Sequence, residues 1–231
     1  MVDMLKTEEI IKRLKAMSNP KQLENSKRLG IETKNSLGIS IWDLRKIAKE
    51  IGKNQRLAEA LWKTKIHEVR LLAGYIADPE KISESVIEEW VSDFDSWDLV
   101  DQVMDVIALS PYGYKKAIEY TGRKEEFVKR TGFVIMAGLA VFDKYAPDEK
   151  FMQFFSIITR ESSDDRNFVK KAVNWALRNI GKRNINLNRK SIETAEQISK
   201  IDSKTAKWIA ADALRELKSE KVQAHLNPLS I

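Results

Sequence analysis

The stretch that decides the fold is FVKKAVNWALR, residues 168–178. It has two partial counterparts, FVKR at residues 127–130 and AKW at residues 206–208. Each begins with apolar and basic residues and continues into an apolar, alanine-rich segment with the 3.6-residue spacing of an α-helix. The three copies lie about 40 residues apart, which indicates an internal repeat of helical units.

The same helical pattern recurs along the chain. We predict five such helices, each preceded by a partner helix, beginning near Ile66, Ser96, Glu125, Arg166 and Lys204. The 9 glycines and 5 prolines fall mostly between these segments, and no window alternates like a strand. Helix pairs with this period are typical of HEAT repeats.

The predicted fold is therefore all-α: a right-handed α-α superhelix, or HEAT-like repeat solenoid. We expect one domain over residues 1–226 and a C-terminal tail at residues 227–231. The alternative is an irregular helical bundle, which the same periodicity would also allow.

Composition narrows the function classes. The 231 residues include no cysteine and two histidines, His67 and His225, which argues against disulfides and metal sites. The N-terminus lacks a signal-peptide core and no apolar run reaches membrane-spanning length, so we expect a cytoplasmic protein with no membrane partner. There is no glycine-rich phosphate loop, nucleophile elbow or Cys–His pair, so carboxylate-based chemistry is the enzyme class that remains.

Charge is segregated along the chain. Residues 78–105 contain ten acidic residues and one basic residue, whereas residues 165–190 contain eight basic residues and one acidic residue. The overall net charge is +6. The basic block is suited to a phosphate backbone, although a solvated outer face is the alternative. We interpret most of the acidic block as ordinary outer surface.

Trp97 and Asp101 are the candidate reactive pair. They lie four residues apart on a predicted helix capped by Ser96, so they share one face. Asp98 and Asp105 flank Asp101 at helical spacing, and these like charges should raise its proton affinity. The alternative is that Asp98 and Asp105 are solvated while Asp101 pairs with a neighbouring helix. We expect Asp101 to be the one carboxylate of the block that turns inward.

The tryptophans divide into two groups. Three lie in apolar helical stripes and are predicted core residues: Trp62, Trp90 and Trp208. Trp175 differs because Asn174 precedes it and Lys171 and Arg178 lie one turn to either side. An indole bordered by cations and an amide is suited to stacking against a sugar or base.

Three elements in this order, WDLVD at 97–101, FVKR at 127–130 and FVKKAVNWALR at 168–178, resemble the AlkD-like DNA alkylation repair glycosylases, which are built from HEAT-like repeats. The family pattern has Trp-Asp-x-x-Asp, an aromatic residue three positions before Arg, and Trp-x-x-Arg. The resemblance extends from about Leu37 to the last repeat. The chain departs from the family pattern at Trp42, where the family has proline, and across residues 25–35.

The resemblance implies a base excision repair hydrolase that removes cationic N3- or N7-alkylated purines from double-stranded DNA without metal or cofactor. Carried over, Asp101 stabilises the oxocarbenium-like sugar, and Trp97 and Trp175 pack against the deoxyribose. Arg130 holds a phosphate. The expected DNA-binding residues are Arg130, Lys129, Lys170, Lys171 and Arg178.

The catalytic and phosphate-binding residues should lie at the same depth of successive repeats and share one basic concave cleft. We expect a monomer. Two alternatives stay open at this point: a HEAT-repeat module that binds DNA structures without catalysis, and a protein-binding scaffold whose basic face is merely solvated.

Overall fold

The computed structural model describes residues 2–31 and 33–227, with side chains from residue 6 onward. Within these residues there are fourteen α-helices and no β-strand, which confirms the all-α class. The chain forms two compact units, Met1–Pro111 and Tyr112–Ile231. The single domain over residues 1–226 stays a prediction. Of the predicted tail at 227–231, Asn227 is described and caps the last helix, while residues 228–231 lie outside the described part.

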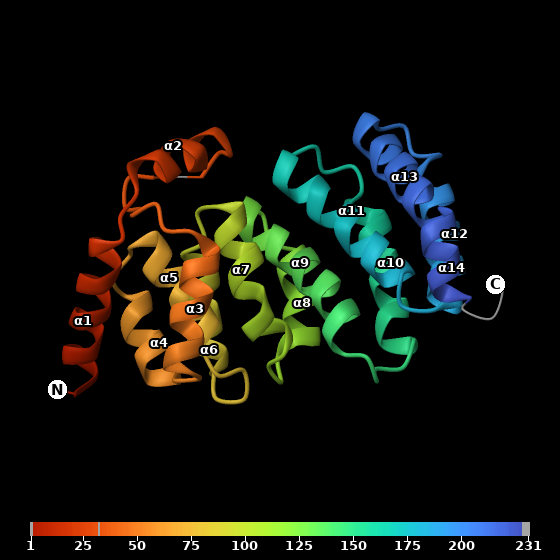
Figure 1. The fold of residues 1–231 in the computed structure, drawn as a ribbon. Coiled ribbons are helices and arrows are strands. Elements are labelled where there is room, and N and C mark those ends of the chain that lie inside the picture. The colour runs from red at the N-terminus through yellow and green to blue at the C-terminus, as the bar shows by residue number, and fades with distance from the viewer. Residues whose placement is uncertain (1, 32, 228–231) are drawn as a thin grey trace. The chain divides into compact units, whose positions relative to one another are not determined.

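The first unit stacks helices in pairs (Figure 1). Its described helices are α1 (Val2–Ala16), α2 (Pro20–Arg28), α3 (Ile41–Ile51), α4 (Gln55–Trp62), α5 (His67–Ile76), α6 (Glu84–Ser92) and α7 (Trp97–Ala108). Helix α5 packs against α3 on one side and α7 on the other, and α4 packs against α5 from a second layer. Trp62 of α4 and Trp90 of α6 stack at 4.4 Å between ring centroids, and both are buried as predicted.

The second unit has the same two-layer arrangement (Figure 1). Its helices within the described residues are α8 (Gly113–Thr121), α9 (Glu126–Phe142), α10 (Glu149–Glu161), α11 (Asn167–Gly181), α12 (Ile185–Ile198), α13 (Lys204–Leu217) and α14 (Glu220–Leu226). Helix α11 packs between α9 and α13, and α10 packs between α8 and α12. Each helix of one layer also packs against its sequence neighbour in the other, as HEAT-like pairing predicts.

The helix starts agree with the predicted repeat. The helices α5, α7, α9, α11 and α13 are preceded by the N-cap residues Ile66, Ser96, Glu125, Arg166 and Ser203. Side chains of Ser40, Asn54 and Ser83 accept a backbone hydrogen bond at the starts of α3, α4 and α6. By contrast, α5, α7, α9 and α11 begin without a side-chain cap. Their first-turn N–H groups are consequently not used by an N-cap side chain.

Two glycines permit the close helix crossings. A Cβ atom at Gly132 of α9 would lie 2.8 Å from the backbone nitrogen of Thr121 in α8. A Cβ atom at Gly74 of α5 would lie 2.8 Å from Val103 Cγ2 in α7. Both distances are far below van der Waals contact, so these two crossings need a residue without a side chain.

Candidate nucleic-acid interface

Trp97 is the first residue of α7, and its indole is half-buried. The indole Nε1 donates a hydrogen bond of 3.0 Å to the carbonyl oxygen of Leu29, the C-cap residue of α2. This bond fixes the polar edge of the ring against the end of α2. The contact that remains available to a ligand is through the ring's exposed apolar surface, as a sugar-packing role requires.

Asp98, and not Asp101, is the buried carboxylate of this helix. Its side chain is 7% exposed, and its Oδ2 lies 2.8 Å from Nε2 of His67 on α5, whose side chain is 10% exposed. The expectation that Asp101 is the one carboxylate turned inward is therefore wrong, and so is the alternative in which Asp98 is solvated. The reason lies in the preceding repeat: His67 supplies a buried cationic partner that the helix itself does not contain.

The two partners shift each other's pKa. Burial alone would raise the pKa of Asp98, but the hydrogen bond and charge of His67 outweigh burial and lower it overall. Burial would lower the pKa of His67, and the bond to Asp98 again prevails, so that the His67 pKa is raised. The geometry thus favours an ion pair of imidazolium and carboxylate between α5 and α7.

Asp101 lies one helical turn beyond Trp97 and is half-buried. The next residue, Gln102, joins three helices of its layer. Its Oε1 accepts hydrogen bonds from the Tyr75 hydroxyl at 2.6 Å and from Arg45 Nη2 at 3.2 Å. Asp101 therefore sits on a helix whose first turn is anchored on both sides, by Trp97 to α2 and by Asp98 to α5.

A second ion pair, between a buried arginine and a half-buried aspartate, was not predicted from the sequence of the acidic block. Arg70 of α5 is buried, and its Nη2 lies 2.9 Å from Asp93 Oδ2, which also accepts from Trp62 Nε1 at 3.1 Å. The sequence signal was available: an arginine in the otherwise apolar run of α5 requires a carboxylate partner. Acids one repeat further along the chain supply the partners for both His67 and Arg70.

The second unit holds a groove lined by residues of three neighbouring helices, α9, α11 and α13. We call it the α9–α13 groove; it is lined by Arg130, Lys171, Asn174, Trp175, Arg178, Trp208 and Asp212. It brings together four residues that the sequence singled out, namely Arg130, Lys171, Trp175 and Arg178. Trp208 was predicted to be core and is 43% exposed, so that prediction is wrong. The apolar stripe of α13 runs instead through Ala206, Ile209, Ala210 and Ala213, and Trp208 lies beside it.

The register along these helices explains the groove. Arg130, Lys171 and Trp208 each lie five residues after the N-cap of their helix, so they occupy one row across three repeats. Trp175 lies nine residues after its N-cap, one turn further along α11. The expectation that Trp175 and Arg130 lie at the same depth is therefore wrong by one helical turn, although both line the groove.

Arg130 is largely covered. It is 5% exposed, and its Nη1 donates a hydrogen bond of 2.7 Å to the carbonyl oxygen of Phe168 on α11. The rings of Phe127 and Phe168 meet beside it at 5.6 Å between centroids. Arg130 thus ties α9 to α11 and lines the groove.

Asp212 is a functional candidate that the sequence analysis missed. Its Oδ2 accepts hydrogen bonds from Asn174 Nδ2 at 2.6 Å and from Arg178 Nη1 at 3.0 Å. Burial would raise the pKa of Asp212, but Asn174, Arg178 and Arg215 outweigh it and lower the pKa. Asp212 lies nine residues after its N-cap, as Trp175 does, so aligning the repeats in sequence would have found it.

Carboxylates of neighbouring helices neutralise much of the basic block. Arg178 also pairs with Glu216 at 2.7 Å, and Lys129 Nζ lies 2.6 Å from Glu161 Oε2 and 3.4 Å from Asp164 Oδ2. Of the five expected DNA-binding residues, Lys170 and Lys171 have no carboxylate partner within the part of the chain that the structure describes. Lys170 lies over the Trp208 ring at 5.6 Å, and Lys171 is exposed.

The groove therefore combines the Lys171 ammonium group, which has no carboxylate partner among the described residues, with two arginines and two indoles. Such a set is suited to a phosphodiester strand, with cations on phosphates and indoles against sugars or bases. Trp97 and Asp101 belong to the first unit, and Arg130 and Trp175 to the second. Their expected convergence in one cleft stays a prediction.

Comparisons with known proteins agree on family and fold. The model of the family described as DNA alkylation repair enzyme matches residues 10–217. A solved structure described as a new family of proteins related to the HEAT-like repeat DNA glycosylases, with affinity for branched DNA structures, is 22% identical. The similarity covers 90% of this chain and 94% of that one, with a TM-score of 0.75. This likeness confirms the HEAT-like repeat fold.

The other comparisons give weaker similarity or none. A designed armadillo repeat protein is 16% identical over 76% of this chain and 92% of that one, with a TM-score of 0.35. No curated protein matches the chain. None of the described helices combines the length and apolar character that crossing a bilayer requires.

Proposed function

We infer that this chain, which belongs to the DNA alkylation repair enzyme family, binds duplex DNA and hydrolyses the N-glycosidic bond of cationic N3- or N7-alkylated purines. The observation that carries this proposal is the anchoring of the first turn of α7. Trp97 is bonded to Leu29 and Asp98 to His67, so the turn directly before Asp101 is held from two sides. A catalytic carboxylate needs such positioning because its charge must face the reacting sugar without reorganising.

The reaction requires little from the protein beyond electrostatic stabilisation of its transition state. Alkylation makes the purine a cationic leaving group, which departs with the electron pair of the C1′–N bond as a neutral base. Positive charge then develops on the deoxyribose, where the Asp101 carboxylate stabilises it. Water adds its oxygen to C1′ and gives up a proton to Asp101 or to solvent. Trp97 and Trp175 pack against the deoxyribose and limit access of bulk water.

The basic residues bind the phosphates of the strand. Lys170 and Lys171 are the strongest candidates because no carboxylate is bonded to them among the described residues. Arg130 offers a guanidinium that the Phe168 carbonyl already orients. Lys129 and Arg178 bind phosphate only if it replaces their carboxylate partners, so we assign them smaller contributions.

The test is release of free 7-methylguanine or 3-methyladenine from methylated duplex DNA by the purified chain. Release that Asp101→Asn greatly impairs supports the proposal, and no release at high enzyme excess refutes it.

A second function has a specific observation in its favour. The solved relative is described by its affinity for branched DNA structures and as related to glycosylases. This chain would then bind DNA junctions or flaps without catalysis. That function predicts salt-sensitive DNA affinity that Asp101→Asn leaves unchanged, together with no base release. A protein scaffold, the third alternative, predicts no steep dependence of DNA binding on salt.

A further inference from the structure

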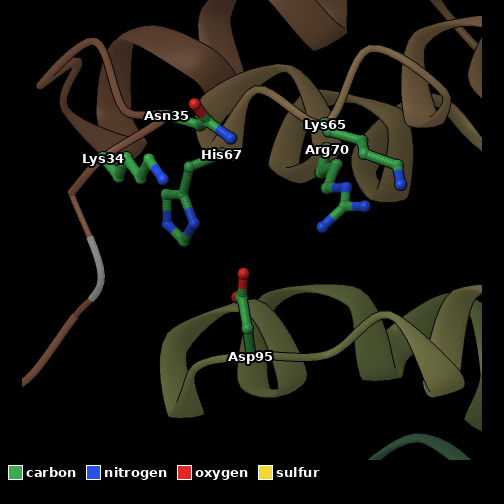
Figure 2. Close-up of a pocket in the computed structure, with 6 residues that line it drawn as sticks. All are labelled: Lys34, Asn35, Lys65, His67, Arg70 and Asp95. Atoms are coloured by element: carbon green, nitrogen blue, oxygen red, sulfur yellow. The ribbon is translucent and has the colours of Figure 1, made fainter.

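The first unit contains a pocket, lined largely by basic side chains, that the proposed chemistry does not use. We call it the α5 pocket; it has a volume of about 230 Å³ and is lined by Lys34, Asn35, Lys65, His67, Arg70 and Asp95 (Figure 2). Its walls come from three separate segments: the loop before α3, the start of α5 and the loop before α7. Four of the six lining side chains carry basic nitrogen.

We propose that the α5 pocket binds a phosphate group of a nucleic acid strand. The proposal rests on the proposed function, because DNA is the phosphate-bearing partner. The chemistry is that of a phosphate oxyanion, which could come from an internal phosphodiester or from a terminal phosphate at a strand end.

The start of α5 is built to receive an anion. Its N-cap residue, Ile66, has no side-chain cap, so no N-cap side chain competes for the N–H groups of the first turn. The helix dipole and the first-turn N–H groups other than that of His67, which donates to the Asn35 carbonyl oxygen, favour negative charge at this position. His67 is itself oriented: its backbone N–H donates to Asn35 at 2.9 Å, and its imidazole is bonded to Asp98.

Lys65 adds an independent observation. It has φ +56° and is the one non-glycine residue with positive φ in the described part of the chain. That conformation is unfavourable for a long side chain and recurs at functional sites. Here it places an exposed lysine on the pocket wall immediately before α5 (Figure 2).

The carboxylates around the pocket determine whether a substitution should strengthen or weaken phosphate binding. Asp93 neutralises Arg70 and Asp98 neutralises His67, whereas Asp95 points across the pocket toward His67 and Arg70 (Figure 2). Asp95 is exposed. It therefore occupies the position opposite the basic wall and repels an incoming phosphate. Its removal should strengthen binding, whereas loss of Lys65 should weaken it.

The chain offers a direct probe because it contains only two histidines, His67 and His225. Proton NMR of the full chain resolves their two C2–H signals, and His225→Gln assigns them. Inorganic phosphate is titrated at constant pH and ionic strength, with chloride as the matched anion. We expect the His67 signal to move saturably with phosphate and not with chloride, while the His225 signal stays still.

Three variants distinguish phosphate binding in the pocket from a general effect of the protein's charge. Lys65→Gln keeps the Cβ atom and removes the charge, and we expect about tenfold weaker phosphate binding, as for loss of one charged hydrogen bond. Lys63→Gln, two residues away, exposed and outside the pocket, should change little. Asp95→Asn should strengthen binding. A His67 signal that ignores phosphate, or that responds equally in Lys65→Gln, overturns the proposal.

DNA probes then identify the source of the phosphate. A short duplex without terminal phosphates that moves the His67 signal indicates a backbone phosphodiester. A response only to the 5′-phosphorylated duplex indicates a strand end, and a response to inorganic phosphate alone rejects a nucleic acid ligand. Base release is measured separately. If the chain releases no base but shows the Lys65-dependent shift of the His67 signal, the glycosylase proposal is refuted and the phosphate-binding proposal for the α5 pocket stands.

Discussion

His67 and Asp98 form a buried ion pair, with 2.8 Å between the imidazole Nε2 and the carboxylate Oδ2. The pair joins consecutive helices of one layer, α5 and α7. It lies between the α5 pocket and the first turn of α7, which carries Trp97 and leads directly to Asp101. One interaction therefore supports both the proposed phosphate site and the proposed catalytic carboxylate.

The pair makes stability depend on pH. Because the folded His67 pKa is raised, its stabilisation is complete below its unfolded pKa of about 6.5 and is lost as the pH rises through the folded value. Because the folded Asp98 pKa is lowered, its stabilisation is lost as the pH falls through that value. We predict that the urea midpoint of the wild type falls as the pH rises above about 6.5.

The His67→Gln variant should lose this alkaline decline and be less stable than the wild type at pH 6. His225→Gln, at an exposed position on α14, is the matched control and should keep the wild-type profile. A His67→Gln profile parallel to that of the wild type would reject the ion pair.

Glu68 holds the loop that precedes α3. Its buried carboxylate accepts hydrogen bonds from Ser36 Oγ at 2.6 Å and from the backbone nitrogens of Leu37 and Gly38, each at 2.7 Å. Glu68→Gln places an amide nitrogen against these donors, so we predict a loss of about 1–3 kcal/mol in unfolding free energy. Hydrogen exchange at Leu37 and Gly38 should accelerate. Glu89→Gln, at an exposed position on α6, should change neither quantity.

The α8–α9 crossing depends on Gly132. A Cβ atom there would lie 2.8 Å from Thr121 N and 2.9 Å from Ala117 O, and backbone atoms cannot yield as a side chain would. We predict that Gly132→Ala lowers the unfolding free energy by about 1–3 kcal/mol. Gly122→Ala, where the nearest atom would be 3.6 Å away, is the control. Equal stability of the two variants would contradict the close crossing.

The α9–α13 groove should account for part of the DNA affinity. Lys171→Gln removes a phosphate contact, so we expect weaker duplex binding and a salt-dependence slope reduced by about 1. Trp175→Ala should weaken binding without changing that slope, because the indole carries no charge. Lys200→Gln, exposed and outside the groove, is the control. Identical slopes for Lys171→Gln and Lys200→Gln would remove the groove from the DNA interface.

The repeat could be predicted from the sequence because it depends on local patterns. Helix starts near Ile66, Ser96, Glu125 and Arg166 follow from apolar periodicity and from the positions of glycine and proline, and the structure places the N-caps at these residues. Burial of Trp62 and Trp90 follows in the same way.

The ion-pair partners could not be predicted in this way. Asp98 and Asp212 are held by residues one repeat away, His67 and Arg178, so neither the acidic nor the basic block behaves as its local charge suggests. Trp208 shows the same limit, because its exposure depends on which neighbouring helices cover α13. Tertiary packing decides which residues of neighbouring repeats form ion pairs, and the spacing of residues along the sequence does not specify those pairs.

The most direct test of the central claim is a single-turnover assay of base release. Excess enzyme is mixed with duplex DNA containing 7-methylguanine, and the free base is quantified over time for the wild type, Asp101→Asn and the exposed control Asp202→Asn. We predict release by the wild type and Asp202→Asn, and at least about 100-fold slower release by Asp101→Asn with unchanged DNA affinity, as expected for loss of electrostatic stabilisation. No release by the wild type, or equal rates for the two variants, would contradict the claim.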